Sequence, residues 1–231
     1  MKNKHLLLLV AICVCFVTQT NAQRQKAKGT VNIKNGFAIA GGLTQYDILT
    51  DNFTTTKGEG WVFGMSATVD LPHKGFNVSY GMQLSENILG VAAKPSLTTS
   101  SIDNSVDYKI FTAQVAFLWH LKLGTDHLTL DIGPMLQYNS DLELKDEDKE
   151  NYIIDGFNSV TAKDFKSLNN VNFNGAIGLT AGISHFKVKA QYIYGVTNIL
   201  GGLNKEDFAQ DLEKKFKGNQ SMLAFTVMFS F

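Results

Sequence analysis

Apolar and polar side chains alternate along most of the chain, and the alternation is clearest at its end. From Leu223 to Phe231 every odd-numbered residue is apolar, while Ala224, Thr226 and Ser230 lie between them. A period of two predicts a β-strand with one apolar face, because successive side chains of a strand point to opposite sides. In a membrane barrel, lipid would cover such a face.

Seven further stretches show the same alternation and predict seven more strands. They are Phe37 to Thr44, Trp61 to Leu71, Phe76 to Ser85, Phe111 to Leu121, Leu128 to Gln137, Val171 to Ile183 and Phe186 to Tyr194. Each has roughly the 9 to 11 residues that a tilted strand needs to cross a bilayer. With the last strand they make eight, an even number as in bacterial single-chain barrels.

The connections between these stretches alternate between short and long. Tight turns follow the second, fourth and sixth strands, and long segments follow the others at 47–60, 86–107, 139–170 and 198–219. In outer-membrane barrels short turns are periplasmic and long loops are extracellular, so both termini should be periplasmic. The predicted fold is all-β: an eight-stranded antiparallel transmembrane β-barrel with short periplasmic turns, long extracellular loops and a short helix in the last loop. Within the fifth strand, Pro134 predicts a bulge beside Gly133 or a shifted boundary.

The N-terminal segment has the pattern of a secretory signal peptide. Lys2 and Lys4 precede an apolar run, and small residues ending at Ala22 form a cleavage site. We therefore expect a signal peptide at 1–22, a periplasmic lead at 23–35 and the barrel domain at 36–231. Both cysteines, Cys13 and Cys15, lie in the signal, which excludes disulfides from the mature chain.

Composition narrows the class of protein further. Beyond the signal no run of about 18 apolar residues occurs, which excludes a helical membrane protein. Without Lys2 and Lys4, 19 basic side chains remain against 21 acidic ones. This lack of basic excess argues against nucleic acid as a partner. We expect a monomer without cofactor or metal, whose partners are outer-membrane lipid and the barrel assembly machinery.

Several of these features together resemble a known family. The signal peptide, the eight alternating stretches, the segment Tyr192 to Ile199 and the ending in Phe are similar to the PorT-like outer-membrane β-barrel family of Gram-negative bacteria. The resemblance covers nearly the whole mature chain and implies the architecture. The family's named member is implicated in protein secretion across the outer membrane, which implies an envelope protein as a partner, although many relatives have no assigned role. Phe225, Phe229 and Phe231 also resemble the C-terminal signal that the barrel assembly machinery recognises.

The inward face of the strands holds the first candidate functional residues. By parity, a polar network points into the lumen, formed by Asp70, Gln83, Gln114, Asp131, Lys187, Lys189 and Gln191. An eight-stranded barrel is just wide enough for its own side chains to fill. Buried charges need partners, so we favour a hydrogen-bonded plug over an ion path or proton relay.

Catalysis is the second candidate. Some small outer-membrane barrels modify lipid with a histidine near the outer leaflet, but His73, His120, His127 and His185 all fall at the short-turn end. The chain has no nucleophile elbow, metal-ligand histidine pair or phosphate-binding glycine loop. We therefore predict that the protein is not an enzyme, with lipid modification as a lesser alternative.

The long loops are the third candidate. The acidic run from Asp141 to Glu150 lacks the spacing of an EF-hand, which leaves a solvated charged surface as the plainer interpretation. In the last loop, Asn204 predicts the start of a helix that runs to Lys217. Phe208, Leu212 and Phe216 would form its apolar stripe, which either packs on the barrel rim or another loop, or docks a partner protein or lipid.

These patterns together predict a non-enzymatic outer-membrane barrel that acts as a structural or surface-interaction protein, as an accessory of a secretion or envelope complex in one interpretation. The alternative is a narrow pore or transport channel for small solutes.

Overall fold

The computed structural model describes residues 35–69, 71, 74–95, 105–124, 127–158, 160–183, 185–209 and 214–231. The predicted signal peptide at 1–22, nearly all of the lead at 23–35, and the residues Asp70, His73 and Leu212 lie outside the described residues. All the described residues belong to one compact unit, Ile33–Phe231.

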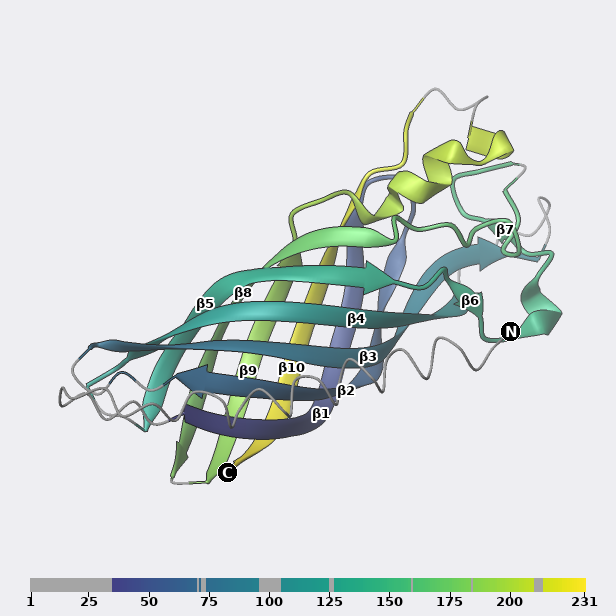
Figure 1. Cartoon of the computed structure of the whole chain (residues 1–231). Coiled ribbons are helices and arrows are strands. Elements are labelled where there is room, and N and C mark those ends of the chain that lie inside the picture. The colour runs from purple at the N-terminus through teal and green to yellow at the C-terminus, as the bar shows by residue number, and fades with distance from the viewer. Residues whose placement is uncertain are drawn as a thin grey trace, which may run out of the picture. The chain divides into compact units, whose positions relative to one another are not determined.

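Eight long antiparallel strands form a closed ring (Figure 1). They are β1 (Asn35–Thr50), β2 (Thr55–Val69), β3 (Phe76–Lys94), β4 (Ser105–Lys122), β5 (Leu128–Asn139), β8 (Val171–Ile183), β9 (Phe186–Gly195) and β10 (Gly218–Ser230). Each pairs with the next along the chain, and β10 returns to pair with β1. The predicted eight-stranded antiparallel barrel, closed by the last strand on the first, is confirmed.

Short strands and helices lie at the end of the barrel that carries the long loops. β6 (Glu143–Leu144) pairs with β4, and β7 (Ile153–Ile154) pairs with β3. Three 3-10 helices are found in the described parts of the loops: η1 (Glu147–Lys149), η2 (Ile199–Lys205) and η3 (Asp207–Ala209). Among the described residues, no helix is long and apolar enough to cross a membrane.

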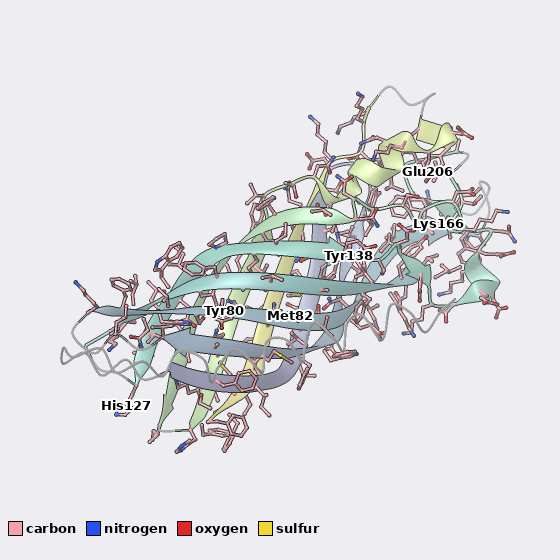
Figure 2. The ribbon with its side chains drawn as sticks, viewed as in Figure 1. Tyr80, Met82, His127, Tyr138, Lys166 and Glu206 are labelled. Carbon is pink, nitrogen blue, oxygen red and sulfur yellow. The ribbon has the colours of Figure 1, made fainter. Side chains whose placement is uncertain are left out.

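The outer face of the barrel is a continuous apolar belt. Its exposed side chains include Phe37, Leu43, Trp61, Phe63, Phe111, Phe117, Trp119, Ile132, Tyr138, Phe173, Ile177, Phe186, Tyr194, Phe225 and Phe229. Aromatic residues lie toward both ends of the strands. In Figure 2, Lys166 and Glu206 mark the loop end of the barrel and His127 marks the end with the short turns.

Four strands, β1 to β4, extend beyond the belt, so the bounds of two predicted loops were wrong. The β1–β2 connection is 51–54 rather than 47–60, and the β3–β4 connection is 95–104 rather than 86–107. Beyond the belt the apolar side chains change faces: Leu43 points outward, whereas Tyr46 and Ile48 are buried inside. The strands continue there because their inward side now packs against the loops.

Pro134 does not cause a bulge, contrary to the prediction. β4 and β5 keep the same register on both sides of Pro134, where Ala116 pairs with Met135 and Trp119 pairs with Ile132. The pairing is interrupted between these two positions, but the register does not shift. A Cβ on Gly133 would lie 2.0 Å from the Phe117 carbonyl oxygen, so the two backbones approach closely there. The proline costs pairing on one side only, because its pairing with Gly175 of β8 is kept.

The last loop does hold a short helix, as predicted, but the predicted bounds from Asn204 to Lys217 and the predicted cap were wrong for the described residues 204–209 and 214–217. Asn198, not Asn204, caps the first helical segment, and its side chain accepts a hydrogen bond from Leu200 N. Glu206 is extended (φ −76°, ψ 150°), which ends η2 before η3 begins. Asn204 instead bonds across the loop to the backbone of Phe216, at 2.7 Å to its nitrogen and 2.9 Å to its oxygen. Tertiary contacts therefore override the local helical pattern.

Candidate functional site

The mouth of the barrel at the loop end is filled by an apolar cluster, which we call the outer plug. Inward-facing strand residues meet residues from the loops. Its fully buried members are Tyr46, Ile48, Leu89, Val91, Val106, Ile110, Ile154, Val160, Phe165, Ile199, Leu200, Leu203 and Phe216. Aromatic contacts tie the loops together: Phe53 packs edge-on against Phe165 at 4.8 Å between ring centroids. Contacts of this kind add to the stability that burial provides.

Hydrogen bonds fasten the loops over the plug. The Tyr108 hydroxyl donates to the carbonyl of Ala162 at 2.9 Å, which joins β4 to the 140–170 loop. Asn198 accepts from Gly218 N at 2.9 Å and donates to the Phe216 carbonyl at 3.0 Å, which joins the last loop to β10. These hydrogen bonds attach the loops directly to the strands of the barrel.

Below the plug, side-chain amides cross the lumen in a layer that we call the amide layer. Gln83 donates to Gln114, Gln114 to Gln137, and Gln137 to both Asn139 and Gln220. Asn174 donates to Gln137 Oε1 at 2.7 Å. Such a chain satisfies most of the buried amide atoms, which matters because a buried polar group without a partner is costly, and only Asn174 Oδ1 lacks a partner in this layer as described.

Toward the short-turn end lies a charged group that we call the inner cluster, centred on Asp131. This carboxylate is fully buried and accepts hydrogen bonds from Thr129 at 2.7 Å and Thr180 at 2.5 Å. Lys189 Nζ lies 3.3 Å from Asp131 Oδ2, and His120 Nδ1 lies 2.7 Å from Oδ1. The ammonium and the donors compensate the buried negative charge.

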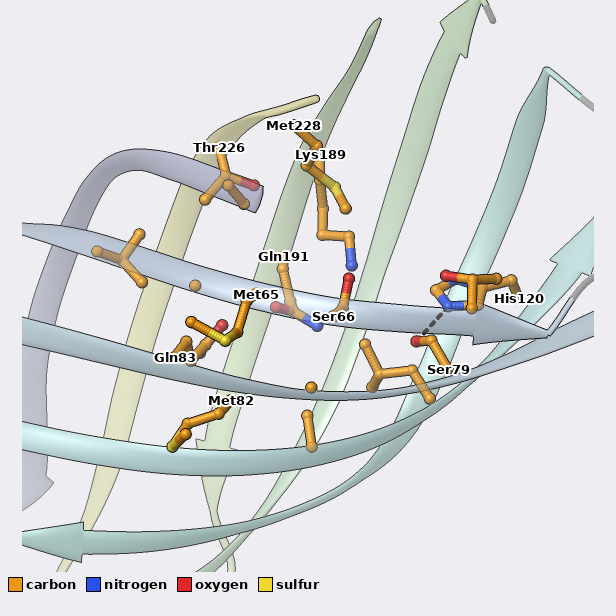
Figure 3. A pocket seen from close by; sticks show the side chains of 17 residues that line it. Met65, Ser66, Ser79, Met82, Gln83, His120, Lys189, Gln191, Thr226 and Met228 are labelled. Carbon is orange, nitrogen blue, oxygen red and sulfur yellow. Dashed lines mark hydrogen bonds between the residues drawn. The ribbon is translucent and has the colours of Figure 1, made fainter. Parts of the chain in front are cut away.

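A cavity of about 70 Å³ adjoins the inner cluster. Ser79, Gln83, His120, Lys189 and Gln191 line it together with small and apolar residues (Figure 3). Gln191 is 4% exposed, and its Nε2 has no hydrogen-bond partner within the described part of the chain.

The residues predicted for the lumen lie at several levels of the barrel. Gln83 and Gln114 belong to the amide layer, while Asp131 and Lys189 form the buried ion pair. Gln191 faces the cavity, and Lys187 is half-buried near the inner end of β9. The predicted assignment of Asp70 falls outside the described residues.

The residues predicted for docking turn inward where they are described. Phe216 is fully buried in the outer plug, and Phe208 is half-buried with its ring 6.1 Å from that of Phe216. These two side chains therefore pack on the loops and the barrel rim, which was one of the two alternatives. At the other end, Phe225 and Phe229 lie on the exposed face of β10, and Phe231 follows it.

Sequence reasoning missed the role of Ser79 and His120 in the inner cluster. The histidines were grouped by their nearness to the turns, and the described ones, His120, His127 and His185, do lie there. Parity along β4 nevertheless turns His120 inward, opposite Asp131 of β5. The signal in the sequence was the inward parity of His120 and of Asp131 on either side of one short turn.

Metal binding finds no support in the side chains that the structure describes. No group of three or more His, Cys, Asp or Glu residues is arranged there to hold an ion. In the acidic run, Asp146 instead lies 3.7 Å from Lys149, and Lys145 lies 3.7 Å from Asp107. This arrangement fits a solvated charged surface.

Comparisons with known proteins concern the fold alone. No protein-family model and no curated protein matches the chain. Neisserial surface protein A is similar in structure, with a TM-score of 0.45, 11% identity, and coverage of 84% of this chain and 97% of that protein. The outer membrane enzyme PagL has a TM-score of 0.36, 10% identity, and coverage of 85% and 99%. At these values neither similarity bears on what this chain does.

Proposed function

We propose that this protein is an outer-membrane β-barrel with a sealed lumen, and that it acts through its folded loops at the cell surface. Its role would be structural or interactive, as an anchor or as an accessory of a secretion or envelope complex. The observation that carries this proposal is the outer plug, which joins strands and loops into one hydrophobic core at the barrel mouth.

The apolar belt supports the membrane location. A ring of exposed Phe, Trp, Leu, Ile and Val side chains surrounds the barrel, which is far more apolar surface than a soluble monomer exposes in one patch. The closed ring also leaves no unpaired edge among its eight long strands, as the hydrocarbon phase requires. Both features fit a barrel in lipid.

The plug and the amide layer argue against the pore alternative. A solute moving along the lumen would have to displace Tyr46, Ile110 and Phe216, which are fully buried, and then break the Gln114–Gln137 bond. The fully buried members of the outer plug are all uncharged, so they offer an ion no counter-charge on this path. We therefore assign the pore the lower rank.

Cysteine labelling tests the location and orientation. The chain has cysteines only at positions 13 and 15, so a single introduced cysteine gives a clean signal if the signal peptide is removed. Asp148→Cys marks the loop end and Lys74→Cys marks the short-turn end, and both positions are exposed. A membrane-impermeant maleimide should label Asp148→Cys on intact cells and Lys74→Cys only after lysis. The reverse pattern would invert the topology, and labelling of neither variant in isolated outer membranes would reject the location.

The interaction role needs a variant that changes the surface but leaves the plug intact. Asp146, Glu147 and Asp148 are exposed and lie outside the plug. Their joint replacement by Asn, Gln and Asn should lower the recovery of any envelope protein that co-purifies with the wild-type barrel from cross-linked membranes. Neutralising Lys74 at the opposite end, as a matched control, should leave that recovery unchanged. If both variants recover the same proteins as wild type, this acidic surface is not the contact.

A further inference from the structure

Three side chains on three neighbouring strands form a continuous hydrogen-bonded relay. Ser79 Oγ of β3 lies 2.7 Å from His120 Nε2 of β4, and His120 Nδ1 lies 2.7 Å from Asp131 Oδ1 of β5. The register places His120 directly opposite both Asn77 and Asp131, so the imidazole bridges the two flanking strands. Hydroxyl, imidazole and carboxylate follow one another in the order found in Ser-His-Asp hydrolases.

The surroundings of Asp131 favour the tautomer that such a relay needs. Because this carboxylate already accepts bonds from Thr129 and Thr180 and pairs with Lys189, it acts as an acceptor toward His120 as well. The proton of a neutral imidazole then sits on Nδ1. Nε2 is left with its lone pair directed at the Ser79 hydroxyl.

The relay opens on the inner cavity, which also presents hydrogen-bond donors. Ser79 and His120 line the cavity together with Lys189 and with Gln191, whose Nε2 is buried and unpartnered in the described structure (Figure 3). A buried donor without a partner is uncommon and calls for an acceptor in the space beside it. Donors beside a nucleophile are what an oxyanion requires.

We propose that the inner cavity is an esterase site in which Ser79 is the nucleophile and His120 the general base. The Ser79 oxygen bonds to the acyl carbon of an ester while its proton moves to His120 Nε2, and the carbonyl electron pair moves to oxygen. Collapse breaks the bond to the alkoxy group, which leaves as the alcohol with the proton from His120. Water then attacks the acyl-serine by the same route, so that ester and water give carboxylic acid and alcohol.

The cavity restricts the substrate class to esters with a short acyl group. Its volume is about 70 Å³, and Val62, Leu118 and Met228 form part of its wall. The outer plug and the amide layer close the other end, so a ligand must enter from the short-turn side. The His120 and Lys189 side chains are 12% and 11% exposed, so both border space of solvent size at the site. A lipid chain at the outer leaflet is not a substrate for this site. The proposal departs from the predicted absence of enzymatic activity only at this cavity.

A small sulfonyl fluoride tests the proposal directly. Refolded wild-type barrel is treated with methanesulfonyl fluoride, and the modified residue is identified by peptide mass spectrometry. We expect one adduct, on Ser79. In His120→Gln, which can still hydrogen-bond the serine but is a poor base, the rate of labelling should fall about 100-fold or more. Ser221→Ala changes a serine outside the cavity, whose hydroxyl lies 3.1 Å from that of Tyr192, and should keep the wild-type rate.

Hydrolysis of p-nitrophenyl acetate gives a second readout. Wild type should release nitrophenolate above background, and Ser79→Ala should reduce the rate to background. Heat-dependent migration on gels confirms that each variant is folded. Absence of a Ser79 adduct on folded wild type would overturn the proposal. Equal labelling of wild type and His120→Gln would also overturn it, since the relay would then be a structural network only.

Discussion

At the scale of single residues, the most constrained group is the buried carboxylate of Asp131. Four side chains hold it: His120, Thr129, Thr180 and Lys189. A charge in this position is tolerated only because it is paired and hydrogen-bonded. The same contacts place the imidazole of His120 next to Ser79, so stability and any chemistry at the site depend on one residue.

The neutral variant Asp131→Asn should therefore destabilise the barrel. It leaves the Lys189 ammonium buried without a counter-charge, which we expect to lower the free energy of unfolding by about 3–5 kcal/mol. Urea unfolding in lipid vesicles measures this loss. Asp155→Asn is the matched control, because it breaks a short but more exposed pair with Lys94, at 2.7 Å, and should cost about 1 kcal/mol or less. Equal losses in the free energy of unfolding for the two variants would contradict the claim that burial makes the Asp131–Lys189 pair more important for stability.

At the scale of elements, the seam between β1 and β10 decides whether the ring closes. A Cβ on Gly42 would lie 1.9 Å from the carbonyl oxygen of Phe225, whereas a Cβ on Gly41 would meet nothing within 4 Å. The two residues are neighbours in the chain, but one faces the lumen side of the seam and the other faces outward.

Alanine at these two positions gives a matched test of the seam. Gly42→Ala should force the strands apart and lower the free energy of unfolding by about 1–3 kcal/mol, or prevent folding altogether. Gly41→Ala should be close to neutral. The yield of heat-modifiable barrel and its urea midpoint report both effects. A Gly42→Ala barrel that matches Gly41→Ala would contradict the seam geometry.

The outer plug is the second element with a sharp test. Phe216 is fully buried in it, so Phe216→Ala removes a large side chain from a packed core at a cost of about 3–5 kcal/mol. Because the segment after η3 is held there, trypsin should cleave after the exposed Lys214, Lys215 and Lys217 faster than in wild type. Phe208→Ala, at a half-buried position, should have the smaller effect. Equal cleavage in all three proteins would mean that Phe216 does not hold the loop.

Alternation predicted the strands well wherever one face meets the belt and the other the polar lumen. The bounds of β8 were predicted to the residue, because the alternation of Val171–Ile183 keeps one phase from end to end. In β1 and β4 the apolar face switches sides, at Leu43 to Tyr46 and at Ile110 to Phe111. Two opposite phases in one strand obscure the period, so the outer parts of these strands were assigned to loops.

The candidate site was harder to predict because it depends on register rather than on local pattern. Parity along each strand shows that Ser79, His120 and Asp131 point inward, but not that they lie at one level. Only the pairing of β3, β4 and β5 brings them together. In the last loop, likewise, the spacing of Phe208 and Phe216 fits a helix, and the bonds from Asn204 to Phe216 override it.

At the scale of the whole barrel, three layers divide the lumen along its length. An apolar plug closes the loop end, hydrogen-bonded amides cross the middle, and a charged cluster with a small cavity lies toward the short turns. This order separates a sealed outer surface from an inner site that borders a small cavity. A barrel built in this way suits anchoring and surface contact better than transport.

Single-channel recording tests the sealed lumen most directly. Purified wild-type barrel is inserted into planar lipid bilayers, with insertion verified by heat-dependent migration of the recovered protein. Because the plug and the amide layer block the lumen, we predict no steady conductance above the bare bilayer at any applied voltage that the membrane withstands. Steady, reproducible openings from the wild-type protein would contradict the account and favour the pore.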